Sequence, residues 1–365
     1  MRPPVDTHHM RHALRLAERA LGEAAPNPAV GCVILSPDGR IVGRGRTGRG
    51  GRPHAETVAL AEAGDEARGA TAYVTLEPCA HHGKTPPCAD ALLLAGIARV
   101  VAAVGDPDPR VSGKGFDRLR AAGVEVVADV LKEEAAALNA GFFLCVRERR
   151  PFVTLKIACS TDGRTTSAGG ESRWITGEEA RRFGHLLRAR HDAILIGVET
   201  ALADDPLLTC RLPGLEDRSP IRVVLDSRLR LPPSSKLART AREIPTWVFT
   251  VSEGGGELRD CGAEVFPVGR DARGRPDIAA VLHTLAERGI TRLIVEGGAG
   301  VHASFVDRRL ADCLDIFRAP LLLGAAGQPA IGALAALGLD EAPLFVGKGA
   351  RRLGSDLLES FSSSH

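Results

Sequence analysis

Apolar and polar positions along residues 1–148 follow helical and strand periodicities in turn. Residues 8–21 carry apolar side chains at helical spacing, which predicts a helix. The runs AVGCVIL and RIVGRG, on either side of an SPDG turn, predict the two strands of a hairpin. Further helices are expected at 54–63, 87–96, 116–122 and 131–143, and further strands at 70–77, 98–106 and 123–128. Strands separated by helices predict a layered α/β domain.

A charged stretch that ends in proline, VRERRP at 146–151, has the composition of an exposed linker. We place a domain boundary near 148–150, which divides the chain into domains 1–148 and 151–365. The second part alternates again, with strands expected at 152–160, 193–198, 221–227, 246–250 and 291–298 and helices at 178–190, 277–289 and 300–310. Strands joined through helices predict a mostly parallel sheet in this domain.

The composition argues against nucleic acid and membranes as partners. The 365 residues exceed the roughly 250 to 300 that one core supports, in agreement with two domains. The formal net charge of the chain is only +2, whereas a nucleic-acid-binding protein typically has a strongly basic surface. No apolar run approaches the roughly 20 residues of a membrane helix, and the charged start lacks a signal core, so we expect a cytoplasmic location. The eight cysteines show no disulfide framework.

The motif HAE at 54–56, followed by PCAHHGKTPPC at 78–88, carries residues that suit a metal ion. Zinc binds imidazole and thiolate, and a catalytic zinc uses three protein ligands so that water takes the fourth position. His54, Cys79 and Cys88 supply these three ligands. Glu56 is placed to take a proton from the bound water and return it to a leaving amine. The pattern is typical of zinc-dependent base deaminases.

The residues alone leave other interpretations of this motif open. Two cysteines at this spacing are often ordinary buried thiols, and a structural zinc would take a fourth ligand from His81 or His82. Deaminases of nucleic-acid bases have two residues between the cysteines, whereas eight intervene here. Lys84 in this longer loop suits a substrate phosphate, which favours a small phosphorylated substrate.

In the second domain, LIVEGGAGVHASF predicts a strand, a glycine-rich turn and a helix. Glycines let backbone amides approach a phosphate at a helix N-terminus, but such a turn is more often only a connection. Lys156 lies in an apolar strand, where a lysine is costly unless it has a partner, so it is predicted to be a site residue. Arg228, just past the strand 221–227, is a candidate for pairing with the extra phosphate of NADP, and a solvated loop is the alternative.

Four segments, PNPAVGCVI, GRPHAE, TLEPCAHHGKTPPC and GDPDPRVSGKG, resemble the deaminase half of the bifunctional riboflavin-biosynthesis deaminase/reductase family. The segments KIACSTDGRTTSAGGESRWITG and HLLRARHDAILIGVETALADDPLLTCR resemble its reductase half. The resemblance implies an α/β protein of two domains, a cytidine-deaminase-like α/β/α layer domain followed by a dihydrofolate-reductase-like α/β domain. One departure is visible, because Thr47 stands where the family often has a histidine.

The resemblance also implies roles for individual residues. Zinc would be carried by His54, Cys79 and Cys88, with Glu56 as the proton shuttle and Asn27 in contact with the pyrimidine. NADPH would be bound at Ala158, Trp174, Thr200, Asp204, Ser227, Gly298, Ala299, Gly300, Val301, His302, Ala303 and Ser304. The sugar phosphate substrate would be bound at Ser172, Arg188, Leu208, Arg211 and Glu296.

We therefore expect a two-step enzyme with Zn²⁺ and NADPH as cofactors. The first site would deaminate a diaminopyrimidinone ribosylamine phosphate by hydrolysis, and the second would reduce the ribosyl chain to ribityl, with Lys156 near the opened sugar. The alternatives are a nucleic-acid base deaminase, a reductase with a structural zinc, and a zinc-held binding module. The aromatic content of 4% disfavours the first, and Glu56 and Lys156 lack a purpose in the last. Fold analogy favours a homo-oligomer.

Overall fold

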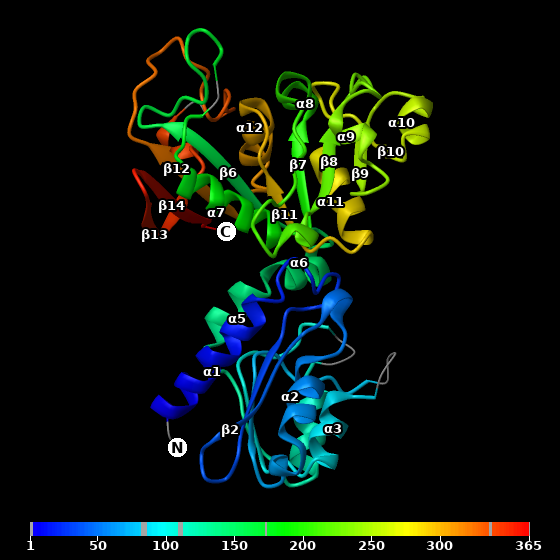
Figure 1. Cartoon of the computed structure of the whole chain (residues 1–365), viewed down its shortest axis with the longest axis vertical. Helices are drawn as coiled ribbons and strands as arrows, with labels where there is room; N and C mark the ends of the chain where they lie inside the picture. Colours follow the sequence, from blue (N-terminus) through cyan, green and yellow to red (C-terminus); the bar gives the residue numbers. More distant parts are fainter. Residues whose placement is uncertain (1–2, 82–85, 109–111, 172–173, 336–337, 365) are drawn as a thin grey trace. The chain divides into compact units, whose positions relative to one another are not determined.

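The computed structural model describes residues 3–81, 86–108, 112–171, 174–335 and 338–364 (Figure 1). The chain divides into two compact units, Met1–Arg149 and Arg150–His365. Within the described residues, each unit contains its own sheet, of five strands in the first unit and nine in the second. Throughout the described residues, the helices are too short or too polar to span a membrane.

The first unit is built on a sheet with the strand order β2-β1-β3-β4-β5. Its strands are β1 (Gly31–Leu35), β2 (Ile41–Arg46), β3 (Thr71–Val74), β4 (Arg99–Ala102) and β5 (Glu125–Val127). Its helices are α1 (Pro3–Glu18), α2 (Ala55–Ala63), α3 (Cys88–Leu94), α4 (Lys114–Ala121), α5 (Lys132–Leu138) and α6 (Ala140–Glu148). β1 runs antiparallel to β2 and β3, whereas β3, β4 and β5 are parallel.

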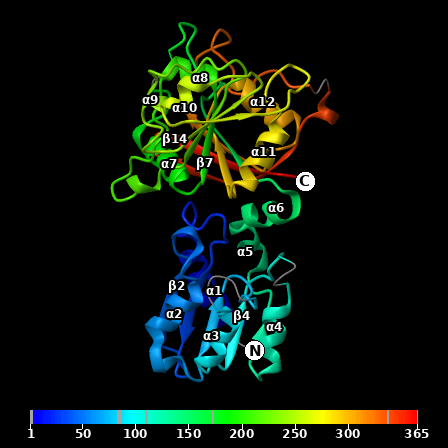
Figure 2. The same ribbon diagram turned by 90° about the vertical axis from the view of Figure 1, so that its right-hand side faces the viewer.

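Helices cover both faces of this sheet. Helices α1 and α5 lie on one face, and α2, α3 and α4 lie on the other (Figures 1 and 2). Gly31 and Gly45 belong to neighbouring strands and let the helices come close, because a Cβ would lie 1.9 Å from the Ala13 carbonyl oxygen or 2.0 Å from the Ala55 carbonyl oxygen, respectively. Gly45 therefore seats the start of α2, which carries the HAE motif, directly on β2.

The helix expected at 131–143 is interrupted at Asn139, which separates α5 from α6. The Asn139 side chain is buried and binds the main chain of Ala29 twice. Its Oδ1 accepts from the Ala29 N–H at 2.9 Å, and its Nδ2 donates to the Ala29 carbonyl at 3.0 Å. Apolar periodicity continues across the break, which is why the pattern alone predicted one helix.

The second unit contains a sheet with the order β10-β9-β8-β7-β11-β6-β12-β14-β13. Its strands are β6 (Phe152–Ser160), β7 (Ala193–Gly197), β8 (Ile221–Leu225), β9 (Thr246–Thr250), β10 (Glu264–Pro267), β11 (Arg292–Val295), β12 (Cys313–Ala319), β13 (Phe345–Leu353) and β14 (Asp356–Ser363). Its helices are α7 (Glu178–Ala189), α8 (Val198–Asp204), α9 (Lys236–Arg239), α10 (Gly256–Asp260), α11 (Ile278–Glu287) and α12 (Ala299–Asp307). Neighbouring strands from β10 to β12 in this order run parallel to each other. β14 runs antiparallel to both β12 and β13, and β13 and β14 form a hairpin.

Side chains alternate across this second sheet and build a core on each face. Ile194, Ile196 and Val224 pack with apolar residues of α7, α8, α9 and α10. Their strand neighbours Leu195 and Val223 pack with α11 and α12 on the opposite face. Because the sheet is covered on both sides, its central strands are rich in apolar residues, and charged residues within them, such as Lys156 and Arg222, need specific partners.

Candidate functional site

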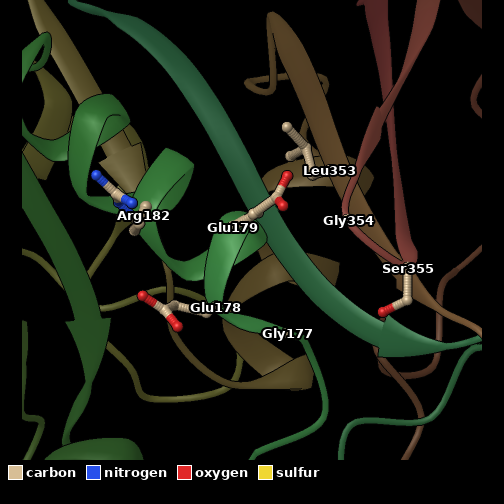
Figure 3. Close-up of a pocket in the computed structure, with 7 residues that line it drawn as sticks. All are labelled: Gly177, Glu178, Glu179, Arg182, Leu353, Gly354 and Ser355. Atoms are coloured by element: carbon tan, nitrogen blue, oxygen red, sulfur yellow. The ribbon is translucent and has the colours of Figure 1, made fainter.

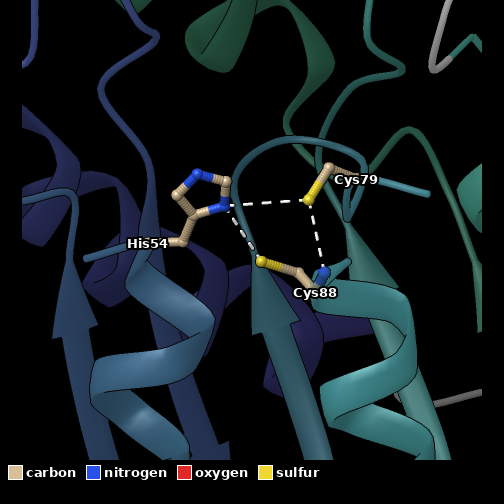
Figure 4. A group of neighbouring side chains, drawn as sticks. All are labelled: His54, Cys79 and Cys88. Atoms are coloured by element: carbon tan, nitrogen blue, oxygen red, sulfur yellow. Dashed lines mark hydrogen bonds between the residues drawn. The ribbon is translucent and has the colours of Figure 1, made fainter. Parts of the chain in front are cut away.

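Three predicted metal ligands lie together in the first unit (Figure 4). His54 directly precedes α2, Cys79 follows β3, and Cys88 is the first residue of α3. His54 Nδ1 lies 3.0 Å from Cys88 Sγ and 3.7 Å from Cys79 Sγ, and the Cys88 N–H donates to Cys79 Sγ at 3.2 Å. One imidazole nitrogen and two sulfurs within 4.8 Å of one another fit the ligand set of Zn²⁺.

The negative charge favoured at Cys79 also suits a cation. Hydrogen bonds from Cys88 and His54 lower the pKa of Cys79 to about 4, against the effect of burial. A thiolate is the form of cysteine that binds zinc. Within the described residues the cluster holds these three ligands and not His81, whereas His82 lies outside the described part of the chain. Three protein ligands leave a coordination position for water, as in catalytic zinc sites.

Glu56 lies beside this cluster in the first turn of α2 and is 4% exposed. Burial, aided by the negative charge of Cys79, raises the pKa of Glu56 to about 7. A carboxyl group that exchanges protons near neutral pH, next to a site for a metal-bound water, is suited to moving the proton of that water.

Asn27 lies against the glycine loop that precedes His54. Its Nδ2 donates to the Gly50 carbonyl at 3.1 Å, and a Cβ on Gly51 would lie 2.1 Å from that same nitrogen. Thr47 is buried, and its hydroxyl accepts from the Val30 N–H at 2.8 Å. Thr47 thus supports the main chain near Asn27 rather than offering a side chain to a ligand. The predicted phosphate contact Lys84 lies outside the described residues.

In the second unit, Lys156, Arg188 and Glu296 form a partly buried charged cluster. Lys156 projects from β6, Arg188 from α7, and Glu296 follows β11. Arg188 and Glu296 share two hydrogen bonds at 2.7 Å and 2.8 Å, and Lys156 Nζ lies 3.8 Å from Glu296 Oε2. Burial lowers the pKa of Lys156, and the charges of Arg188 and Lys156 hold the pKa of Glu296 at about 2 despite burial. The partner that a lysine needs in an apolar strand is therefore Glu296.

The predicted substrate residues Leu208 and Arg211 belong to a loop beside this cluster. Arg188 Nη1 donates to the Thr209 carbonyl at 3.1 Å, and Arg211 Nη1 donates to the Thr209 hydroxyl at 3.4 Å. The sequence reasoning missed His185, whose Nδ1 lies 3.1 Å from the same carbonyl and accepts from the Arg211 N–H at 3.3 Å. Leu208 is buried with a φ of 55°. Ser172 lies outside the described residues.

The glycine turn predicted to bind a dinucleotide leads from β11 into α12. Gly298 has a φ of 55°, and its Cβ position lies 3.5 Å from Thr200 Oγ1 on α8. A Cβ on Gly297 would lie 2.7 Å from Ile196 Cα, so the turn passes close to β7. The absence of side chains at both positions leaves backbone amides at the start of α12 able to approach a phosphate, which fits a dinucleotide.

The other residues of the predicted dinucleotide site differ in their burial and in their interaction partners. Asp204 ends α8, and the Ser227 carbonyl accepts from the Ser252 hydroxyl at 2.8 Å. The His302 ring is buried, with Nδ1 3.1 Å from the Ala330 carbonyl, so it packs within the protein. Trp174 is 69% exposed, and the Arg181 guanidinium lies 4.8 Å from its ring centroid. The remaining predicted contacts lie on β6 and in the first turns of α12, namely Ala158, Ala299, Gly300, Val301, Ala303 and Ser304.

A separate cavity of about 300 Å³ lies at the N-terminus of α7 (Figure 3). It is lined by Gly177, Glu178, Glu179, Arg182, Leu353, Gly354 and Ser355. None of these residues was predicted as a site residue. Two carboxylates at a helix N-terminus stabilise the helix and leave this cavity poorly suited to an anionic ligand.

Comparisons with known proteins agree with both halves of the chain. Residues 4–104 match the cytidine and deoxycytidylate deaminase zinc-binding region, and residues 151–358 match the RibD C-terminal domain. The riboflavin biosynthesis protein RibD of Aquifex aeolicus is 41% identical over 359 residues, which cover 98% of each chain. That of Escherichia coli is 41% identical over 363 residues, covering 96% of this chain and 98% of the relative.

Solved structures extend the similarity to three dimensions. A structure of Acinetobacter baumannii RibD covers 100% of both chains with a TM-score of 0.89 and 36% identity. A Thermotoga maritima protein described as a diaminohydroxyphosphoribosylaminopyrimidine deaminase/5-amino-6-(5-phosphoribosylamino)uracil reductase also covers 100% of both chains, with a TM-score of 0.88 and 35% identity. The resemblance and the fold class expected from the sequence are confirmed. The chain belongs to the RibD family of bifunctional riboflavin-biosynthesis enzymes, with a zinc-binding deaminase domain and an NADPH-dependent reductase domain.

Proposed function

We propose that the chain hydrolytically deaminates 2,5-diamino-6-(5-phosphoribosylamino)pyrimidin-4-one and then reduces the ribosyl chain of the product to ribityl. The observation that carries the first step is the meeting of three metal ligands with the buried carboxyl of Glu56. The described activities of the Thermotoga relative support both steps. The product would be 5-amino-6-(5-phosphoribitylamino)uracil.

In the deaminase domain, His54, Cys79 and Cys88 would hold Zn²⁺, which when bound supplies the Lewis acidity that makes water nucleophilic near neutral pH. Glu56 takes a proton from this water and delivers it to the nitrogen of the departing amine. Asn27 orients the pyrimidine from the glycine loop, and Lys84 binds the substrate phosphate. Asn139 holds the main chain of Ala29 by two hydrogen bonds and so supports the position of Asn27.

In the reductase domain, NADPH when bound supplies the hydride that reduces the anomeric carbon. The cofactor would lie on the turn that begins α12, with Thr200, Asp204 and Ser227 at its edges. Arg228 is exposed past the end of β8, where it suits the extra phosphate of NADP. Lys156 delivers a proton to the sugar ring oxygen as the ring opens, and burial, which lowers its pKa, favours release of that proton.

The substrate phosphate would lie near Arg188 and Arg211. Glu296 contacts both Lys156 and Arg188, so one carboxylate faces two cations, and Arg211 adds a third. The excess of positive charge favours a phosphate ester over a neutral sugar. Ser172 and Leu208 complete the proposed substrate contacts. We further propose a cytoplasmic location and, by fold analogy, a homo-oligomer.

The experiment that tests the proposed function measures ammonia release and NADPH oxidation on the diaminopyrimidinone substrate, using zinc-loaded protein. We expect ammonia with or without NADPH, and NADPH oxidation only after ammonia has been released. Glu56→Gln should keep its zinc and lose deamination by about 100-fold or more. Ammonia release that is absent despite bound zinc would instead support a structural zinc and leave reduction as the sole activity.

A further inference from the structure

Glu77 lies between β3 and Cys79, the proposed zinc ligand, and the residue is 3% exposed. Among the described residues of a distant segment of the chain, four backbone N–H groups donate hydrogen bonds to its carboxylate. The donors to Oε2 are Asp106 at 3.3 Å and Gly113 at 3.0 Å, and the donors to Oε1 are Gly115 at 2.9 Å and Phe116 at 3.4 Å. One carboxylate therefore organises the described residues on both sides of the 109–111 segment.

Two of these donors belong to the first turn of α4, at Gly115 and Phe116. The first N–H groups of a helix have no partner within the helix and must be satisfied from elsewhere. Here the acceptor is a charged side chain from another element, which forms stronger hydrogen bonds than a neutral acceptor does. The negative charge also interacts favourably with the positive end of the helix dipole. Glu77, which follows the central strand β3, thus caps the N-terminus of α4.

Besides these hydrogen bonds, the backbone of α4 packs closely against residues 77–79, here called the Cys79 turn. A Cβ on Gly115 would lie 2.0 Å from the carbonyl oxygen of Pro78, the residue between Glu77 and Cys79. A Cβ on Gly105 would lie 3.7 Å from Glu77 Oε2, which is an ordinary van der Waals distance. Gly115 is therefore required for α4 to sit on this turn, whereas Gly105 is not.

The Cys79 turn is held from its other sides too. The Glu77 N–H donates to the Val104 carbonyl at 2.9 Å, and the Ala89 N–H donates to the Cys79 carbonyl at 3.2 Å. These bonds attach the turn to the strand end at Val104 and to α3, which carries Cys88. Glu77 supplies the remaining attachment, to α4, so the backbone that presents Cys79 Sγ is constrained by three elements.

We propose that Glu77 is a positioning residue of the zinc site, which holds Cys79 in the geometry that the metal needs. This inference rests on the proposed role of Cys79 as a ligand. Groups that orient metal ligands contribute to metal affinity without contacting the metal, and their loss typically weakens binding by about 10- to 100-fold. A residue that only stabilised the fold would change the unfolding temperature and leave the zinc dissociation constant unchanged.

The first test is Glu77→Gln, measured by competition for zinc with a chromophoric chelator. Glutamine keeps the shape of the side chain, but its amide group presents N–H to backbone N–H donors and has one acceptor oxygen. We expect the zinc dissociation constant to rise about 10- to 100-fold and the absorption spectrum of the Co²⁺-loaded protein to shift. Glu125→Gln is the matched control, because Glu125 is a 65% exposed carboxylate in the same unit and should leave zinc affinity unchanged.

A pair of glycine variants tests the geometry without altering the carboxylate. Gly115→Ala should displace α4 from Pro78 and weaken zinc binding in the same direction as Glu77→Gln, whereas Gly105→Ala should bind zinc as the wild type does. If Glu77→Gln does not fold, Gly115→Ala carries the test alone. Reduction of the already deaminated intermediate reports that the second unit is intact in each variant.

Wild-type zinc affinity in Glu77→Gln and Gly115→Ala would overturn the proposal, even if both variants melt at lower temperature. The assay also separates this failure from a failure of the proposed function. A wild-type protein that binds zinc tightly but releases no ammonia would refute the deaminase assignment, while the comparison of zinc affinities would still decide the role of Glu77.

Discussion

Arg188 and Glu296 face each other across the reductase domain through two parallel hydrogen bonds, Nε to Oε1 at 2.7 Å and Nη2 to Oε2 at 2.8 Å. Their side chains are 16% and 8% exposed. The same carboxylate lies 3.8 Å from Lys156, so it stabilises two cations that would otherwise be buried without a counter-charge. The arrangement keeps Lys156 close to the turn that begins α12.

Replacing this carboxylate by an amide, in Glu296→Gln, should impair reduction and spare deamination. The change leaves the partly buried Lys156 and Arg188 without their anionic partner, which is destabilising for charged groups that are largely removed from water. We expect kcat/KM for NADPH-dependent reduction to fall about 100-fold or more, and ammonia release to stay within about twofold of the wild type. Glu359→Gln, in the same unit and paired with Arg318, is a control that should retain reduction. Unimpaired reduction in Glu296→Gln would contradict the proposed site.

Lys156→Met should remove the proposed proton donor while keeping the aliphatic bulk of the side chain. General acid catalysis typically contributes about 100- to 10,000-fold, so we expect a loss of kcat in this range, with ammonia release unchanged. The readout is NADPH oxidation with the deaminated intermediate as substrate. Lys348→Met, at an exposed position of β13, is the matched control. If Lys156→Met or Lys156→Ala reduces the sugar at the normal rate, Lys156 is not the donor.

Removal of zinc should separate the two activities. Treatment with a strong chelator takes away the ion that His54, Cys79 and Cys88 are proposed to hold, so deamination should be lost and should return when Zn²⁺ is restored. Reduction of the deaminated intermediate should continue in the metal-free protein, because the described residues of the second unit contain no group of three or more His, Cys, Asp or Glu side chains placed to hold a metal ion. Cys88→Ser should behave like the metal-free protein, with deamination lost and reduction retained. Deamination by fully metal-free protein would rule out the proposed mechanism.

The ion pair between Asp6 and Arg99 should make the first unit sensitive to acid. Hydrogen bonds from Arg99, opposed by burial, lower the pKa of Asp6 below its usual 3.8. The stabilisation is therefore complete above about pH 3.8 and is lost as the pH falls through the lower pKa of the folded state. Asp6→Asn should reduce the unfolding free energy by about 2 kcal/mol at pH 7, less than for a fully buried pair because Arg99 is 21% exposed.

Calorimetry between pH 3 and pH 7 provides the measurement for Asp6→Asn. The stability difference from the wild type should shrink as the pH falls below about 3.8, because the Asp6 carboxylate of the unfolded chain then takes up a proton, and it should vanish below the lower pKa of the folded state. Asp117→Asn, whose carboxylate is 78% exposed, should show little difference at any pH. A difference for Asp6→Asn that stays constant down to pH 3 would show that the charge of Asp6 does not contribute.

Much of the site could be anticipated from residue type and spacing. His54, Cys79 and Cys88 follow from the ligand preferences of zinc, and Glu56 follows from the need for a proton carrier beside the bound water. Lys156 follows from the cost of a lysine in an apolar strand. The sequence pattern did not indicate which residues interact with Lys156 or with Glu77. Nothing near Lys156 in the chain indicates Glu296, and nothing near Glu77 indicates the N-terminus of α4, because both pairings join segments that packing brings together.

The amino-acid sequence by itself predicted the strands of the first unit, β6, β7, β8, β9 and β11 of the second, the division into two domains and the chemistry of the metal ligands, but it did not predict β10, β12, β13 or β14. The predicted features are properties of short segments, since periodicity, turns and ligand type depend on neighbouring residues. The tertiary structure alone decided which carboxylate pairs with Arg188, 108 residues away, and which main chain Asn139 holds, 110 residues away. Such contacts depend on how sheets and helices pack over the whole unit, and the local sequence pattern therefore does not predict them.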